Sequence, residues 1–348
     1  MNYLKDKLKN FLVPNNWQKI TTIDTHTAGE PLRIVTSGIP ELPGDNILKK
    51  RQYMMDNYDH LRKQLMWEPR GHADMYGCII TPPVSKEADF GVVFMHNEGY
   101  SSMCGHGIIA VTKVAIESGL VKNSEPQTIV KIDSPAGLIT AIGHIKNGKV
   151  GKVSFQNIPS YVVALDDEIL IPVYGKIKYD LAFGGAYYAY VQAGDVGLTC
   201  YPKDIYQLIH VGRKVKRAVS NSVQIKHPFN DELSFLYGTI FIDKPENADS
   251  HSRNVCIFAD GEVDRSPTGT GISGRLAIHY ARGEIGVGEP IIIESVIGSK
   301  FSGIVLKETK FGQYNAIIPE VYGEAFITGK NEFYIDPDDP IQGGIFLR

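Results

Sequence analysis

The sequence has few cysteines, and they are far apart. Only four occur among the 348 residues, and no two of them form a C-x-x-C pair. Such spacing is typical neither of a zinc site nor of a disulfide framework. We therefore expect no metal ion and a reducing, cytoplasmic environment for this chain.

Long apolar runs and an excess of one charge are also absent. No run of about 18 apolar residues occurs, so we expect no membrane-spanning helix. Lysines interrupt the first 20 residues, where a signal peptide would need an apolar core. The 36 Lys and Arg nearly balance the 39 Asp and Glu, for a net charge of -3. This balance gives no electrostatic reason to expect a nucleic acid or a membrane as partner.

The most informative feature present is an internal repeat with an offset of about 164 residues. The segment CGHGIIAVTKVAIESG, from Cys104, matches TGTGISGRLAIHYARG, from Thr268. Each segment follows a strand-like stretch, has apolar residues at helical spacing and ends in glycine. We therefore expect two α/β domains of similar topology, over residues 18–183 and 184–330. A tail, residues 331–348, could pack back on the first domain.

Cys104 and Thr268 occupy the same place, at the starts of the two predicted helices. A helix N-terminus offers free N–H groups and a positive dipole end, so it is a natural anion site. Two such ends facing one cleft would hold a carboxylate from both sides. The dipole is expected to lower the pKa of the Cys104 thiol. The thiolate could then act as a base, with help from His106.

The residues around the second helix start leave more than one role open. The hydroxyl of Thr268 can hydrogen-bond a substrate but is a poor proton carrier near neutral pH. Asp264, four residues earlier, could cap the helix or pair with a substrate ammonium group. Cys78, Cys200 and Cys256 are interpreted as buried structural cysteines, because free cysteine often packs in cores.

A competing motif lies in the same segment. Gly269-Thr-Gly271-Ile-Ser-Gly274 matches G-x-G-x-x-G, and Glu294 follows 20 residues beyond its last glycine. That pattern is typical of dinucleotide binding. Three observations speak against it: the turn does not follow a strand directly, the motif lies late in the chain, and its sister copy begins with a cysteine.

Together these motifs resemble the proline racemase family. The two signatures are MCGHG, from residue 103, and DRSPTGTG, from residue 264. Further similar stretches are DTHTAGEPLRIV (residues 24–35) and EPRGHADMYG (residues 68–77). The resemblance covers about residues 20–330. It implies an α/β (α+β) fold like that of diaminopimelate epimerase, with two pseudo-symmetric domains, each wrapping β-structure around a central helix.

The resemblance also implies a site between the two domains, with the substrate carboxylate at both helix starts. By resemblance, the substrate contacts would be made by Gly105, His106, Gly269 and Thr270, and Asp264 would hold the ring nitrogen of a proline-type substrate. Racemases and 4-hydroxyproline epimerases of the family carry one cysteine on each side of the substrate. The family's chemistry needs no cofactor. The loop residues His72 and Asp74 are interpreted as hydrogen-bonded neighbours of the site.

This sequence departs from the racemase pattern at Thr268, where the second cysteine would stand. Cysteine paired with threonine resembles the trans-3-hydroxy-L-proline dehydratases of the family. The stereochemistry of that substrate gives an independent reason, since its α-hydrogen and 3-hydroxyl lie on one face of the ring. A single base, Cys104, could remove the proton and help the hydroxyl leave, so we expect loss of water to give 1-pyrroline-2-carboxylate.

Three alternatives stay open at this point. A racemase or 4-hydroxyproline epimerase would use Thr268 or water as its second acid. A non-catalytic amino-acid-binding protein would keep the fold and bind without turnover. A dinucleotide enzyme would use the glycine motif. For any of these small-molecule functions a homodimer is the default expectation.

Overall fold

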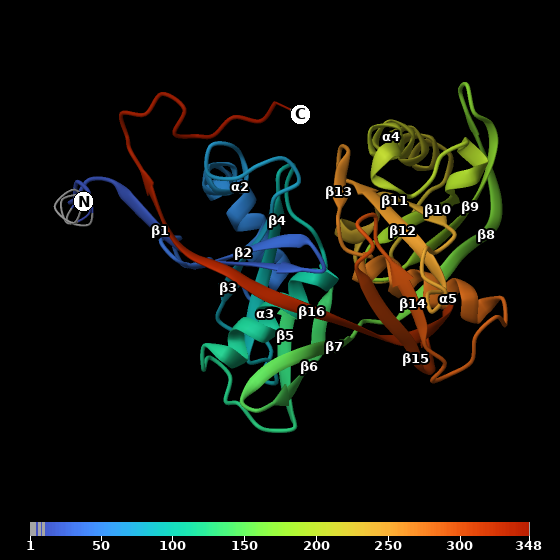
Figure 1. The fold of residues 1–348 in the computed structure, drawn as a ribbon, viewed down its shortest axis with the longest axis horizontal. Coiled ribbons are helices and arrows are strands. Elements are labelled where there is room, and N and C mark those ends of the chain that lie inside the picture. The colour runs from blue at the N-terminus through green and yellow to red at the C-terminus, as the bar shows by residue number, and fades with distance from the viewer. Residues whose placement is uncertain (1–4, 6–7, 9–10, 348) are drawn as a thin grey trace.

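The computed structural model describes Lys5, Leu8 and residues 11–347. The first 20 residues, for which no signal peptide is expected, lie partly outside the described residues. The described chain forms two lobes that lie side by side, and one long strand runs between them (Figure 1). No helix in the described ranges has the length and apolar character needed to span a membrane.

The first lobe contains strands β1 to β7. Its strands pair in sequence from β1 to β7, with parallel pairs at β2–β3 and β4–β5 and antiparallel pairs elsewhere. Helix α3 is nearly all buried, because its apolar residues surround it rather than forming one stripe. The elements are β1 (Gln18–Thr27), β2 (Glu30–Ser37), α2 (Ile47–Met66), β3 (Tyr76–Thr81), β4 (Phe90–His96), α3 (Gly105–Glu117), β5 (Gln127–Ser134), β6 (Gly137–Lys146) and β7 (Lys149–Gln156).

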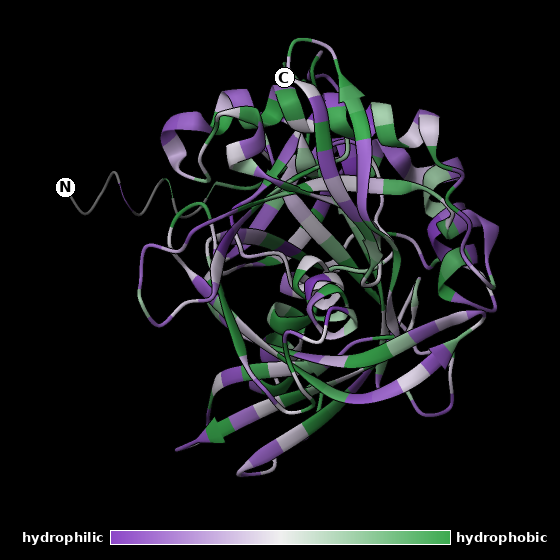
Figure 2. Cartoon of the chain, turned by 90° about the vertical axis from the view of Figure 1, so that its right-hand side faces the viewer, coloured by the Kyte–Doolittle hydropathy of each residue, from purple (hydrophilic) through white to green (hydrophobic). Residues whose placement is uncertain are grey.

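The second lobe repeats this plan around helix α5, and the turned view shows a helix enclosed by strands (Figure 2). Helix α4 packs against β11 on the outside. The elements are β8 (Ser160–Ile171), β9 (Gly175–Phe183), β10 (Tyr187–Gln192), α4 (Ile205–Ser222), β11 (Leu236–Asp243), β12 (Ser252–Phe258), β13 (Glu262–Asp264), α5 (Gly269–Ala281), β14 (Ile291–Glu294), β15 (Lys300–Phe311) and β16 (Tyr314–Ile335); three short 3-10 turns cover Ala193–Val196, Pro202–Asp204 and Asp231–Leu233.

Strand β16 belongs to both lobes. Its first half pairs with β15, its middle pairs with β7, and its last part pairs with β1, from Thr27↔Ala325 to Gln18↔Ile335. The tail beyond it returns to the first lobe, where Ile345 bridges Glu68 and Phe346 stacks on Trp67. The two lobes are therefore tied by continuous sheet hydrogen bonding as well as by side chains.

The domain ranges 18–183, 184–330 and 331–348 remain a prediction. Strand pairing bears on them in two places. Strands β8 and β9 continue the ladder of β10, so residues 160–183 group with the second lobe although they precede the predicted boundary. Strand β16 crosses from one lobe to the other instead of ending a domain. Neither pairing can be inferred from the periodicity of a single strand.

The two predicted helix starts are confirmed. Helices α3 and α5 each have 13 residues, and their N-caps are Cys104 and Thr268. Just beyond their ends, Gly119 and Gly283 adopt φ values of 79° and 70°, the left-handed conformation that commonly stops a helix.

The starts of the two helices meet at a pair of glycines. A Cβ placed on Gly105 would lie 2.7 Å from the Cα of Gly269, and the reverse distance would be 3.0 Å. Both positions also face the Cζ of Phe155, at 3.0 and 3.2 Å. Only residues without a side chain allow this approach, and it brings the two N-caps to one place in the molecule.

We expect Gly105→Ala to separate the helix starts, because the added methyl group meets the backbone of Gly269 rather than a flexible side chain. Overpacking of this kind costs about 1–3 kcal/mol, and a shift near 1 Å in a catalytic site can cost about a hundredfold in rate. Thermal unfolding and turnover of the purified variant would measure both effects. The matched control is Gly99→Ala, since a Cβ there would meet no atom within 4 Å. Equal behaviour of the two variants would contradict this account.

Candidate active site

One small cavity lies between the lobes, with a volume of about 20 Å³. That is room for about one water molecule, so the walls close tightly around it. All of the residues predicted for the site line this cavity: Cys104, Gly105, His106, Asp264, Thr268, Gly269 and Thr270. The structure thus brings together two segments about 164 residues apart in sequence. The chemical roles of these residues remain predictions.

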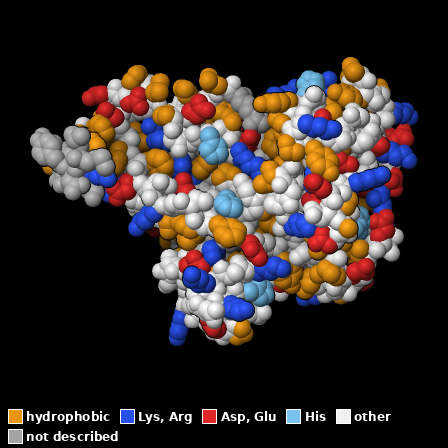
Figure 3. All heavy atoms as spheres, viewed as in Figure 1, with side chains coloured by type: hydrophobic (Ala, Val, Ile, Leu, Met, Phe, Trp, Pro, Cys, Tyr) orange, Lys and Arg blue, Asp and Glu red, His pale blue; other side chains and the backbone are white. Residues whose placement is uncertain are grey.

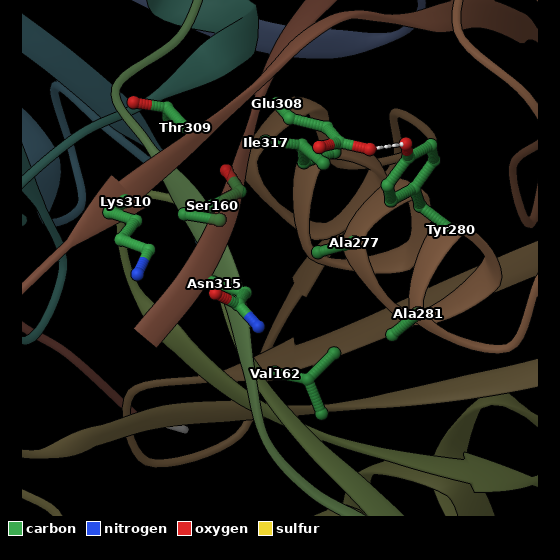
Figure 4. A pocket seen from close by; sticks show the side chains of 11 residues that line it. Ser160, Val162, Ala277, Tyr280, Ala281, Glu308, Thr309, Lys310, Asn315 and Ile317 are labelled. Carbon is green, nitrogen blue, oxygen red and sulfur yellow. Dashed lines mark hydrogen bonds between the residues drawn. The ribbon is translucent and has the colours of Figure 1, made fainter. Parts of the chain in front are cut away.

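A larger hollow of about 660 Å³ lies elsewhere, at the far end of α5 (Figure 4). Its walls come from α5, β8, β15 and β16, and the hydroxyl of Tyr280 donates to Glu308 across it. It contains none of the predicted site residues and neither cysteine nor histidine. Size alone therefore does not identify the site of chemistry here.

Cys104 is held at the start of α3 with its thiol facing the helix amides. The Sγ accepts a hydrogen bond from the Gly107 N–H at 3.2 Å and lies 3.2 Å from Nδ1 of His106. Its backbone is extended, with φ -142°, as is usual for an N-cap. The neighbouring imidazole thus lies within hydrogen-bond distance of the thiol.

The prediction that the helix start lowers the pKa of Cys104 is wrong for this structure. Burial raises the pKa of the Cys104 thiol well above its usual range, and the nearby carboxyl groups of Asp264 and Glu30 act in the same direction. The Gly107 N–H opposes the shift but is outweighed. Burial also lowers the pKa of His106 to about 3, so the imidazole is neutral. Loss of water around the pair dominates over the helix dipole.

Thr268 adopts a backbone conformation that is unusual for its type. Its φ is 66°, in the left-handed region that a β-branched residue rarely enters. Such a conformation costs about 1–3 kcal/mol and is found mainly where the surrounding structure imposes it. The hydroxyl oxygen is buried, and among the described residues it forms no hydrogen bond of standard geometry. It nevertheless lies close enough to Asp264 and Cys256 to lower the pKa of both groups. The Thr268 hydroxyl therefore belongs to the polar cluster at the cavity.

Asp264 ends strand β13, opposite Cys256 in the register with β12. Its Oδ1 accepts the backbone N–H of Ser266 at 2.8 Å. The suggestion that Asp264 caps the helix is not supported, because this bond closes the loop before α5 and not the helix itself. Burial raises the pKa of the Asp264 carboxyl to about 6. A buried carboxylate in this position is suited to pair with a positively charged group.

An aromatic wall that the sequence motifs do not predict completes the cavity. Tyr76, Tyr188, Tyr237 and Phe258 line it together with Met103 and Cys256. The ring of Tyr76 meets that of His106 edge-on at 4.8 Å, and Tyr237 stacks on Phe258 at 5.5 Å. The hydroxyls of Tyr188 and Thr270 are 2.8 Å apart. The four aromatic side chains reach the site from strands β3, β10, β11 and β12, and their direction depends on sheet register.

Cys256 has a second position-dependent feature besides the predicted burial in the core. It is buried, as expected, but it also contributes to the cavity wall. Burial raises the pKa of its thiol, and Asp264 acts in the same direction. Cys78 and Cys200 lie in the core away from the cavity, as interpreted. All four cysteines are free.

The loop residues His72 and Asp74 lie outside the cavity wall. His72 contacts the carbonyl of Ala73, and Asp74 accepts the backbone N–H of Val263 at 3.1 Å. The interpretation as a hydrogen-bonded loop beside the site agrees with these contacts. Within the described residues no group of three or more His, Cys, Asp or Glu side chains is arranged to hold a metal ion.

The glycines of the G-x-G-x-x-G motif have packing roles. A Cβ on Gly271 would lie 2.4 Å from Cδ1 of Ile240, and one on Gly274 would lie 2.1 Å from the hydroxyl of Tyr190. They let α5 approach strands β10 and β11 inside the lobe. The motif therefore has a structural explanation that involves no nucleotide.

Comparison with solved structures defines the class of fold. A hydroxyproline epimerase from Agrobacterium vitis, crystallised with trans-4-hydroxy-L-proline, superposes with a TM-score of 0.90 at 30% identity, covering 96% of each chain. A Bacillus anthracis protein of the phenazine biosynthesis PhzF family shares the fold alone, with a TM-score of 0.57 at 14% identity over 90% of this chain and 99% of that one. The expected diaminopimelate epimerase-like fold is confirmed.

Sequence comparison defines the family. The profile described as "Proline racemase" matches residues 22–346, so the chain belongs to the proline racemase family. A relative from Colwellia psychrerythraea named trans-3-hydroxy-L-proline dehydratase is 51% identical, over 94% of this chain and 93% of its own. A protein of the same name from Bacillus thuringiensis subsp. konkukian is 49% identical, over 94% and 98%.

We expect the Asp264→Asn variant to be less active than the wild type and more stable at high pH. Because the folded state raises the pKa of Asp264 to about 6, the fold favours the protonated acid. The protonated carboxyl therefore stabilises the folded state fully at pH values below its unfolded pKa, and this stabilisation is lost as the pH rises through 6. At pH 8 the buried charge costs on the order of 2–3 kcal/mol, which a neutral amide avoids. Urea unfolding should show the variant to be more stable at pH 8 and equal to wild type near pH 3.

The same pKa sets the pH dependence of turnover if Asp264 must be ionised. For the wild type, kcat/KM should fall more steeply below about pH 6 than above it, by a further factor of about ten for each pH unit, and the Asn variant should be nearly inactive at every pH. Initial rates between pH 4.5 and 8 would measure this. A variant that is less stable at pH 8, or fully active, would contradict the assignment of Asp264.

Proposed function

We propose that this protein is a trans-3-hydroxy-L-proline dehydratase, which removes water without a cofactor to give 1-pyrroline-2-carboxylate. The observation that carries the proposal is the pairing of Cys104 and Thr268 as the N-caps of two helices that meet at one cavity. Relatives that carry this activity in their names, at 44–51% identity over nearly the whole chain, support it.

Cys104 is the proposed base. Its thiolate takes the α-proton of the substrate, and the negative charge that develops is delocalised into the substrate carboxylate. The amides of Gly105, His106, Gly269 and Thr270 belong to the first turns of α3 and α5, where helix geometry provides no internal partner. They are proposed to hold that carboxylate and to stabilise its added charge.

Departure of the hydroxyl completes the elimination. The C3–O bond breaks, the new C2–C3 double bond forms, and the proton carried by Cys104 leaves with the hydroxyl as water. The thiolate is thereby regenerated, and the enamine tautomerises to the pyrroline. Both transfers occur on one face of the ring, so no proton carrier is needed on the side of Thr268. Its buried hydroxyl is available to hydrogen-bond the substrate.

Asp264 is proposed to bind the ring nitrogen. The ammonium charge of the substrate favours the ionised carboxylate, which burial alone disfavours. Binding of the substrate therefore supplies a positive charge next to the Asp264 carboxylate. The aromatic wall, with Tyr76 and Tyr237, would pack against the apolar part of the ring.

The proposal also includes an oligomeric state and a location in the cell. We propose a homodimer, the commonest assembly for an enzyme of this size. We also propose a cytoplasmic location, which the presence of four free cysteines supports. Acidic and basic side chains are interspersed over the face seen in Figure 3, in line with the net charge of -3 and with a small molecule as the partner.

The decisive test is turnover without added cofactor. We expect trans-3-hydroxy-L-proline to yield a pyrroline that reacts with o-aminobenzaldehyde. L-proline and trans-4-hydroxy-L-proline should keep their configuration, as read by chiral chromatography. Inversion at C2 of either compound, with no pyrroline from the 3-hydroxy substrate, would replace the proposal by a racemase or epimerase. Binding without any turnover would indicate a non-catalytic protein.

We expect Cys104→Ser to lose at least about a thousandfold in kcat, because a serine hydroxyl is a far weaker base than a thiolate. The raised pKa of Cys104 further predicts that wild-type activity rises with pH above neutrality. The comparison variant is Cys78→Ala, which removes a buried thiol away from the cavity. It should keep the kcat of the folded enzyme. Full activity of a folded Cys104→Ser protein would exclude Cys104 as the base.

A further inference from the structure

The turn between β1 and β2 contacts the start of α3 and the segment that precedes α5. It consists of Thr27, Ala28, Gly29 and Glu30, with Thr27 paired to Glu30. The two central residues have φ values of 52° and 95°, as in the two-residue turns that suit a hairpin. This turn lies within one of the stretches shared with the family, yet neither the proposed base nor the cavity wall includes it.

At one end of the turn, Glu30 holds the segment that carries Asp264. Its side chain is fully buried. The Oε2 accepts the backbone N–H of Arg265 at 2.8 Å and its Nη1 at 3.2 Å. The amide involved directly follows Asp264, so the bond fixes the peptide plane next to that carboxylate. The contact joins the first lobe to the second.

The hydrogen bond from the backbone N–H of Arg265 needs only an oxygen acceptor on Glu30, whereas the contact from its guanidinium is an ion pair when Glu30 is charged. Burial and the neighbouring Asp264 raise the pKa of the Glu30 carboxyl well above its usual range, while Arg265 opposes the shift. The Oε1 has no hydrogen-bond partner among the described residues. One oxygen thus accepts from the Arg265 amide in either protonation state, and the other is free to carry a proton.

At the other end of the turn, Thr27 holds the start of α3. Its hydroxyl donates to the carbonyl of His106 at 2.9 Å. The middle of the turn is wedged against the second lobe. Ser299 donates to the carbonyl of Ala28 at 2.8 Å, and a Cβ on Gly29 would lie 2.3 Å from Cδ1 of Ile297. Movement of the turn would therefore disturb both walls of the cavity.

We infer that the Thr27–Glu30 turn is a positioning element for the active site, in which Glu30 sets the orientation of Asp264 toward the ring nitrogen and Thr27 sets the start of α3 toward the carboxylate. The inference rests on the proposed role of Asp264 in substrate binding. Glu30 acts through Arg265 and Asp264, and Thr27 acts through His106, so neither residue is itself a catalytic group.

Two ligands that differ at one ring position distinguish the effect of the turn on Asp264 from its effect on the carboxylate site. L-proline carries both a carboxylate and a ring ammonium, whereas tetrahydrofuran-2-carboxylate has an uncharged ether oxygen in place of the nitrogen. Glu30→Ala removes the acceptor for the Arg265 amide, and Glu30→Asp withdraws it by one methylene while keeping the carboxyl group. For both, calorimetry should show L-proline affinity reduced about tenfold or more. The affinity for the ether should stay within about threefold.

Conservative variants provide the matched controls. Glu30→Gln keeps an oxygen acceptor of the same reach, so it should bind both ligands like the wild type. Thr27→Val removes the bond to the His106 carbonyl and should weaken both ligands, because both carry the carboxylate. Thr27→Ser should restore them. Circular dichroism and thermal unfolding would verify that each variant is folded.

The outcomes distinguish this inference from the proposed function. Equal losses for both ligands in Glu30→Ala and Glu30→Asp would make Glu30 a purely structural residue and overturn the inference. Unchanged affinity in both variants, or a loss in Glu30→Gln equal to that in Glu30→Ala, would overturn it as well. A wild-type protein that binds neither of these ligands nor trans-3-hydroxy-L-proline would instead refute the proposed substrate class. If Glu30→Ala does not fold, the comparison of Glu30→Asp with Glu30→Gln decides the question alone.

Discussion

The contact between Gly105 and Gly269 is the constraint on which the rest of the structure depends. Two helix starts can meet backbone to backbone only where neither residue has a side chain. Each lobe encloses its helix in sheet, so the meeting point lies deep between the lobes. The residues that precede the two glycines, Cys104 and Thr268, then face a single cavity. The internal repeat of the sequence becomes one site through this contact.

Burial gives the site its electrostatic character. Cys104 and Asp264 are both held toward their neutral forms, and His106 is kept neutral. In the proposed function, an amino acid with a protonated ring nitrogen would bring a cation for Asp264 and an anion for the helix amides. Charges that are costly in the closed cavity are thereby compensated by the substrate itself. A tight cavity of about 20 Å³ has room for about one water molecule, so little solvent is present to weaken these interactions.

Two kinds of connection keep the lobes in register around this site. Strand β16 provides a continuous backbone link from the second lobe to the first. The contacts of Glu30 with Arg265 and of His96 with Glu262, whose Nδ1 and Oε1 atoms are 3.1 Å apart, tie the lobes together close to the cavity. The strand sets the overall arrangement of the lobes, and the buried side chains set the local alignment of the catalytic groups.

The sequence by itself determined the helix starts, the residues gathered at them and the missing second cysteine at Thr268, because these follow from a repeat whose copies must fold alike. Only the tertiary structure decided that Tyr76, Tyr188, Tyr237 and Cys256 face the cavity. Their direction depends on strand register across the sheet, which local patterns do not encode. The tertiary structure also reversed the expected direction of the pKa shift of Cys104. The helix dipole can be inferred from a motif, whereas the loss of solvent that outweighs it exists only when both lobes enclose the thiol.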